Sequence, residues 1–151
     1  MTSHRAITIL AVCLTFAAVA VASAAPQPDT RYAGNTSQGK KASLRTTPTG
    51  GGVEQFVIRR VFRCAVEDGE ETVSGVFRQS SGVLAVADNG TFRGSSKVRP
   101  TRQIKRGVFT LAGRFGPRGR VARGTYRERV RLRSGTRCDT GKVRFRLRAP
   151  G

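Results

Sequence analysis

The chain has 151 residues, 28 lysines and arginines, nine acidic residues and a formal net charge of +19 at pH 7. This length suits one domain, and the excess of positive charge favours a negatively charged partner over a basic one. The single histidine, His4, lies near the N-terminus. Histidine-based catalytic triads and metal sites are therefore excluded from the rest of the chain.

Residues 1–24 are predicted to be a secretory signal peptide. Arg5 precedes an apolar run at residues 7–21, and Ala22, Ser23 and Ala24 follow it as a small-residue cleavage site. An uncleaved membrane anchor is the alternative, because the run is nearly long enough to span a bilayer. Cleavage after Ala24 removes one arginine and no acid, so the remainder carries a charge of +18 and has no stable membrane span.

Two cysteines, Cys64 and Cys138, remain after the predicted cleavage, since Cys13 lies in the predicted signal peptide. An exported chain meets oxidising conditions, which favour pairing them. The bridge would close a loop of about 75 residues, worth roughly 4 kcal/mol on the chain-entropy model. Metal ligation is not expected, and the sequence predicts no cofactor.

Residues 25–30 read as an extended leader before an all-β domain at residues 31–149. Residues 32–39 are rich in turn formers, and residues 67–71 form an acidic turn. Adjacent Arg59 and Arg60 interrupt an otherwise apolar strand, which predicts a β-bulge there. We expect strands at residues 42–46, 53–66, 72–78, 83–87, 91–98, 108–115, 120–132 and 138–148, the last with strict alternation from Lys142 on.

The last of these strands carries the clearest pattern. Val143, Phe145 and Leu147 alternate with basic residues, as in a strand with one buried face. Glycine recurs two residues before an aromatic residue at Phe77, Phe92, Phe109, Phe115 and Tyr126, which predicts a glycine near a bend and an inward ring. The predicted fold is a single-domain antiparallel β-sandwich or barrel of about 7–9 short strands with one disulfide and no helix.

Two short motifs resemble a known group of proteins. One is Tyr-x-Gly-x-Thr-Ser-Gln-Gly at residues 32–39, and the other is Cys-x-Thr-Gly-x-Val-x-Phe at residues 138–145. Together with the glycine and phenylalanine repeats, they are similar to small secreted β-rich proteins of high-GC bacteria. The resemblance implies an exported β-protein, and it assigns no activity and no site residues.

Three acidic features are candidate catalytic or cation-binding groups. Glu128 shares the inward phase of its strand, so it is a buried acid or base, or it pairs with an inward arginine, or a bulge turns it outward. Asp139, Thr140 and Gly141 form the triplet that carries the aspartic-protease carboxylate, although an Asp-capped turn also explains it. The acidic turn lacks the ligand spacing of a calcium loop, which favours a solvated hairpin tip.

Basic residues form the sharpest positive feature. Two rows of four alternate along the last two long strands, and a hairpin would place all eight on one face. Like charges across strands are unfavourable unless an anionic partner or solvent compensates. Either the face binds an anionic polymer, or it reflects arginine-rich composition, since 23 of the 28 cations are arginine. The candidate anion-binding residues are Arg127, Arg129, Arg131, Arg133, Lys142, Arg144, Arg146 and Arg148.

The sequence therefore predicts a secreted or cell-envelope binding module without enzymatic activity. The two tyrosines supply a poor aromatic platform for sugars or single-stranded nucleic acid. Because export also makes a nucleic-acid role less natural, an anionic cell-wall polymer or acidic polysaccharide fits better than nucleic acid. Two alternatives stay open: a small secreted hydrolase that uses Glu128 or Asp139, and a purely structural envelope protein.

Overall fold

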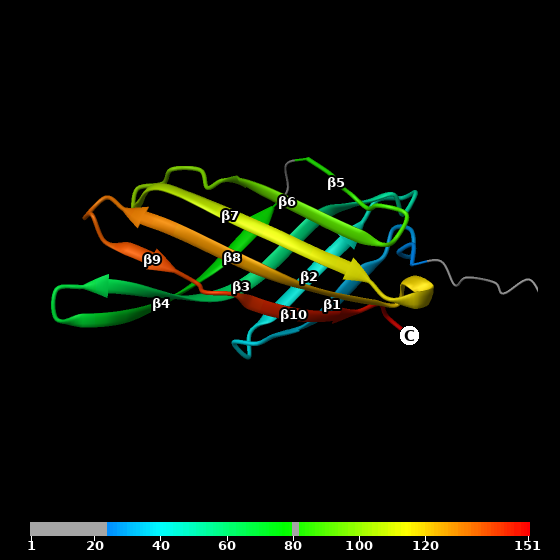
Figure 1. Ribbon diagram of the computed structural model, residues 1–151, viewed down its shortest axis with the longest axis horizontal. Coiled ribbons are helices and arrows are strands. Elements are labelled where there is room, and N and C mark those ends of the chain that lie inside the picture. Colours follow the sequence, from blue (N-terminus) through cyan, green and yellow to red (C-terminus); the bar gives the residue numbers. More distant parts are fainter. Residues whose placement is uncertain (1–23, 80–81) are drawn as a thin grey trace, which may run out of the picture.

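The computed structural model describes residues 24–79 and 82–151. The predicted signal peptide, except Ala24, lies outside the described residues. The rest is all-β, as predicted (Figure 1). It contains one 3-10 turn, η1 (Pro117–Gly119), and the strands β1 (Arg31–Thr36), β2 (Lys41–Thr46), β3 (Gly52–Val66), β4 (Gly69–Gln79), β5 (Leu84–Ala85), β6 (Thr91–Lys97), β7 (Ile104–Phe115), β8 (Val121–Leu132), β9 (Arg137–Asp139) and β10 (Val143–Arg148).

Antiparallel pairing closes six of these strands into a barrel. The ring runs β1, β2, β3, β9, β8, β10 and back to β1. β4 and β5 extend the sheet beyond β3, whereas β7 and β6 extend it beyond β8. The prediction left a sandwich and a barrel open, and the closed ring decides for a barrel with added strands.

The ring depends on one segment that changes partners. β9 and β10 both pair with β8 on one side, but on the other side β9 pairs with β3 and β10 with β1. The sequence did not predict β1, and the single strand predicted at residues 138–148 is divided into β9 and β10. In β1, turn-forming Gly34 is required because β10 approaches so closely that a Cβ would lie 2.1 Å from the carbonyl oxygen of Arg146.

The predicted bulge at Arg59 and Arg60 is wrong. β3 and β4 keep one register from Phe56 to Val66, and the burial of β3 alternates through both arginines. Arg59 points outward, whereas Arg60 is 6 % exposed and points inward. The apparent break in the pattern is therefore an inward charge rather than an extra residue.

The core has two apolar parts on either side of that charge. The larger one includes Phe56, Ile58 and Tyr126, and the smaller one contains Phe62, Val130 and the two cysteines. The aromatic rings after the repeated glycines point inward as predicted, but most of those glycines lie inside strands. Gly124, for example, makes room for a neighbouring ring, because a Cβ there would lie 2.4 Å from Phe145 Cζ.

One side chain fills a gap in the barrel wall. On one edge of β3, the pairing with β2 ends at Ile58 and the pairing with β9 begins at Arg63. Between them, Gln38 Nε2 donates to the Val61 carbonyl at 2.9 Å, and the Val61 N–H donates to Gln38 Oε1 at 2.9 Å. Gln38 also donates to the Thr140 carbonyl at 3.2 Å. Its amide thus replaces a missing strand neighbour.

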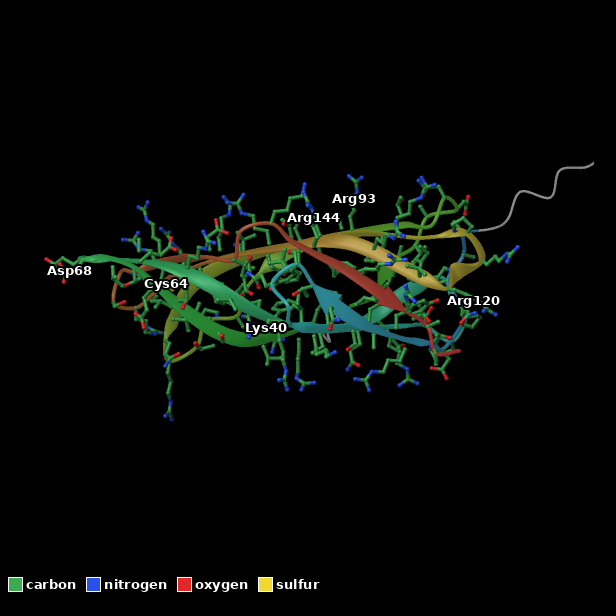
Figure 2. The ribbon with its side chains drawn as sticks, turned by 90° about the horizontal axis from the view of Figure 1, so that it is seen from below. Lys40, Cys64, Asp68, Arg93, Arg120 and Arg144 are labelled. Atoms are coloured by element: carbon green, nitrogen blue, oxygen red, sulfur yellow. A yellow bond between two sulfur atoms is a disulfide. The ribbon has the colours of Figure 1, made fainter. Side chains whose placement is uncertain are left out.

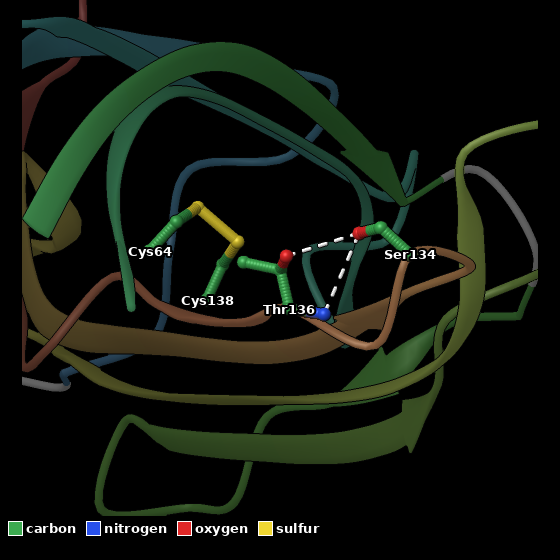
Figure 3. The surroundings of a disulfide bond; sticks show 4 residues. All are labelled: Cys64, Ser134, Thr136 and Cys138. Carbon is green, nitrogen blue, oxygen red and sulfur yellow. Dashed lines mark hydrogen bonds between the residues drawn. A yellow bond between two sulfur atoms is a disulfide. The ribbon is translucent and has the colours of Figure 1, made fainter. Parts of the chain in front are cut away.

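The disulfide between Cys64 and Cys138 is confirmed. The two cysteines lie opposite each other in the β3–β9 pair, with their Cα atoms 4.0 Å apart (Figure 3). The turn from β8 to β9 is held by Ser134 Oγ, which lies 3.0 Å from Thr136 Oγ1. The bridge therefore fixes the three-residue strand β9 to the long strand β3.

Removing the bridge should weaken the fold without changing it. We expect the variant Cys64→Ala/Cys138→Ala to lose about 4 kcal/mol of unfolding free energy, because the unfolded chain regains a long loop. Urea denaturation followed by circular dichroism measures the loss, with reduced wild-type protein as the comparison. Equal midpoints for the oxidised protein and the variant would contradict this assignment.

Removal of the Gln38 amide group should lower the stability of the fold. Gln38→Met keeps the volume but leaves the N–H and carbonyl of Val61 without their partner, so we expect a loss of about 1–3 kcal/mol. The matched control is Gln103→Met in the exposed loop between β6 and β7, which should change stability by less than about 0.5 kcal/mol. Equal losses in the two variants would show that the gap is closed in another way.

Candidate functional site

The eight candidate anion-binding residues all point away from the core. Seven are exposed and Arg131 is partly buried, as the alternation of apolar and basic residues predicts. Figure 2 shows Arg144 and Arg93 projecting from one side of the molecule, with Asp68 at the far tip of the β3–β4 hairpin.

The sequence analysis expected a hairpin that pairs the two rows of basic residues with each other. The structure does not pair them in this way. β10 pairs with the first half of β8, so Arg146 lies opposite Arg123 and Arg144 lies opposite Thr125. The second half of β8 pairs with β9 instead. The basic surface therefore has two parts: the β10 row (Lys142, Arg144, Arg146 and Arg148) and a second part around Arg129 and Arg131.

The second part surrounds a concavity of about 1110 Å³ on the outer surface of β3, β9, β8 and β7. One line across three neighbouring strands consists of Arg137, Arg131 and Arg106, each directly opposite the next. We call the whole concavity, with this line of arginines, the basic concavity. Its cationic residues are Arg63, Lys97, Arg106, Arg129, Arg131 and Arg137.

Four of these cations were not among the sequence candidates: Arg63, Lys97, Arg106 and Arg137. Two of them could have been found. Because Cys64 and Cys138 face each other inside paired strands, the neighbouring Arg63 and Arg137 must point outward on those strands. Lys97 and Arg106 join the concavity only through the register of β6 and β7, including a bulge near Lys105.

Few acids offset this charge. Among the described residues, Lys97, Arg106, Arg129, Arg131 and Arg137 have no carboxylate oxygen within 4.0 Å. Arg127, by contrast, is held by Asp139 at 2.6 Å, and Arg63 lies 3.8 Å from Glu70. The concavity consequently keeps most of its positive charge available to an external anion.

Asp139 forms the turn that the sequence analysis favoured. Its Oδ1 accepts a hydrogen bond from the Gly141 N–H at 2.8 Å, and Gly141 has a positive φ of 64°. Hydrogen bonds from Arg127 hold the pKa of Asp139 below its ordinary value, and the Gly141 N–H adds to the effect. Asp139 is therefore an ionised turn residue paired with an arginine, which does not match a protease carboxylate that shares a proton.

Glu128 is fully buried and pairs with the inward Arg60, which is one of the structural alternatives in the sequence analysis. Arg60 Nε donates to Glu128 Oε2 at 2.5 Å, and Arg60 Nη2 donates to Oε1 at 3.1 Å. The Tyr126 hydroxyl also donates to Oε2. Both carboxylate oxygens are thus occupied by protein donors, so Glu128 is poorly placed to take a proton from a substrate.

The acidic turn is a solvated hairpin tip. Glu67, Asp68, Glu70 and Glu71 are all exposed. Within residues 24–79 and 82–151, no three His, Cys, Asp or Glu side chains gather as metal ligands. In the same ranges, no helix has the length and apolar character needed to cross a membrane.

Comparison of the chain with protein-family models, curated proteins and solved structures found no match.

The two tyrosines provide a pH test of this core. Burial raises the pKa of Tyr126, with the Glu128 carboxylate adding to the shift, and burial also raises the pKa of Tyr32. A phenol in the unfolded chain ionises near pH 10. The folded protein therefore holds more protons than the unfolded chain above that pH, so stability should be full below pH 10 and fall as the pH rises further.

Absorbance at 295 nm measures this directly, because the sequence has only two tyrosines. At pH 10.5 we expect a smaller phenolate signal from the folded protein than from the protein in urea, because the pKa of both tyrosines is raised by folding. The variant Tyr126→Phe should still show a protected Tyr32. Free ionisation of both tyrosines at pH 10.5, with the fold intact by circular dichroism, would contradict their burial.

Proposed function

We propose that this protein is a secreted, non-enzymatic binding module that holds an anionic polymer on its outer basic surface. The observation that carries the proposal is the line of Arg137, Arg131 and Arg106 across three strands, without a described carboxylate within 4.0 Å. Like charges directly opposite each other destabilise a sheet. A bound polyanion removes that repulsion, so binding and fold stability support each other.

The extent of the surface favours a polymer over a small anion. The concavity draws cations from β3, β9, β8, β7 and β6, and neighbouring strands lie about 4.8 Å apart. Its cations therefore extend over roughly 15–20 Å. A single phosphate or sulfate neutralises only part of that width, whereas an extended chain of negative groups can meet several arginines at once.

The type of polymer follows from what the surface lacks. Tyr32 and Tyr126 are both fully buried, so neither tyrosine offers a stacking platform for unpaired bases. The predicted export adds a second argument against nucleic acid. An acidic polysaccharide or an anionic cell-wall polymer at the bacterial envelope fits the charge and the predicted compartment best.

Binding should depend steeply on salt. We expect the purified, disulfide-bonded protein to bind a sulfated polysaccharide and purified bacterial cell wall, with affinity falling as counterions compete. The variant Arg106→Ser/Arg131→Ser/Arg137→Ser should bind at least tenfold more weakly at low salt and lower the log–log salt slope by about two. Pull-down or fluorescence anisotropy across a salt series measures both quantities, with duplex DNA as the competing polyanion.

The matched control removes equal charge elsewhere. Arg31→Ser/Arg59→Ser/Arg93→Ser changes three exposed arginines outside the concavity and should weaken binding only slightly. The variant Lys142→Ser/Arg144→Ser/Arg146→Ser/Arg148→Ser measures the share of the β10 row. If both triple variants weaken binding equally, the arginines of the concavity act only as general surface charge and the proposed site is wrong. If the protein binds duplex DNA most tightly, the proposed class of polymer is wrong.

A further inference from the structure

A second concave site lies on the other side of the barrel wall, where two strand edges stay apart. In the described part of the chain, β4 pairs with β3 and β6 pairs with β7, and no strand pairing joins β4 to β6. β5 closes one end of the gap by pairing with β3, and its neighbour Val86 bridges to Phe92. The result is a cleft of about 750 Å³, within the size range of small-molecule sites.

Apolar side chains form about half of the cleft lining. Phe77 of β4 and Phe109 of β7 pack against each other there with their rings tilted and their centroids 4.5 Å apart. Val98 and Ile104 line one end, and Val76 at the mouth is 50 % exposed. An open cleft with aromatic walls and an exposed valine at its mouth leaves apolar surface in water that a ligand could cover.

The rim carries positive charge. Arg78, Lys97 and Arg99 line the cleft and are exposed. Among the described residues, none of these three has a carboxylate oxygen within 4.0 Å. At the base, in contrast, Arg60 and Glu128 neutralise each other. The charge that can attract an anion therefore lies at the mouth and not at the floor.

We propose that this cleft binds a single-chain anionic amphiphile, such as a fatty acid, with its tail over Phe77 and Phe109 and its head group on the rim cations. The apolar walls account for the tail, and the uncompensated rim accounts for the sign of the head group. The neutral pair at the base sets the orientation, because a buried head group there would place a second anion beside Glu128. The two sites share Lys97, but Arg78 and Arg99 lie outside the basic concavity, so the two kinds of binding can be tested separately.

Chain length and head-group charge test the proposal on the purified, disulfide-bonded protein. By calorimetry below micelle formation, decanoate should bind about tenfold more tightly than octanoate, because two more methylenes leave water. Decyltrimethylammonium, with the same tail and the opposite charge, should bind about tenfold more weakly than decanoate. A surface that only attracts carboxylates would bind decanoate and octanoate alike, and that result would overturn the proposal.

Two variants locate the binding. Ser96 lies opposite Phe109 on the inward face of β6, so Ser96→Trp should fill the cleft and abolish decanoate binding. Its control, Thr110→Trp, places the same ring on the exposed face of β7 and should bind as the wild type does. Unchanged binding in Ser96→Trp would overturn the proposal.

Arg78→Ser/Arg99→Ser should weaken decanoate binding about threefold to tenfold. Arg93→Ser/Lys105→Ser removes two exposed cations that do not line the cleft and should change it little. Equal effects of the two double variants would contradict the placement of the head group on the rim cations. Polymer binding by Ser96→Trp should stay normal, so failure of this site and failure of the basic concavity are distinguishable.

Discussion

The closure of the barrel depends on one backbone segment and the side chain that covers its gap. Residues 137–148 follow β8 on one side but exchange β3 for β1 on the other. Gln38 occupies the point of exchange by bonding to Val61 of β3 and to Thr140 between β9 and β10. Without these bonds, backbone polar groups would lose their partners at the place where the ring closes.

This arrangement brings residues 32–39 and 138–145, the two short sequence motifs, into contact. Gln38 belongs to the first motif and Thr140 to the second, and the same two segments also meet where the Arg144 N–H donates to Ser37 Oγ at 3.0 Å. Thr140 Oγ1 in turn accepts the N–H of Glu128 at 2.9 Å. The motifs are thus two halves of one structural joint, and this joint also positions the buried carboxylate.

The buried ion pair marks where sequence reasoning succeeded and where it stopped. The parity of β8 placed Glu128 inside and suggested an inward arginine as its partner. The same parity applied to β3 would have identified Arg60, but two adjacent arginines looked like a bulge because a buried arginine is rare. Arg60 and Glu128 are 68 positions apart in the chain, and only the folded structure shows that they form one ion pair.

Local patterns predicted local features well. The disulfide, the inward face of β10 and the turn at Asp139 each follow from residues a few positions apart or from a count of cysteines. The strand β1, the division of the last predicted strand into β9 and β10, and the pairing of β10 with the first half of β8 were not predictable in this way. They depend on partner exchange between distant segments, and alternation within a strand says nothing about which strand lies beside it.

The same distinction decides how the arginines should be interpreted. Alternating arginines on an exposed strand face are expected in any arginine-rich β-protein, so the rows alone do not indicate binding. Register adds the missing information, since it places Arg137, Arg131 and Arg106 in a line across strands. Four of the nine acids gather at the β3–β4 hairpin tip, and of the acids in the described part of the chain only Glu70 and Asp139 line the concavity beside its six cations. A sheet arranged only for stability would intersperse the two signs of charge, and this separation is what favours an external anion as the partner of the basic concavity.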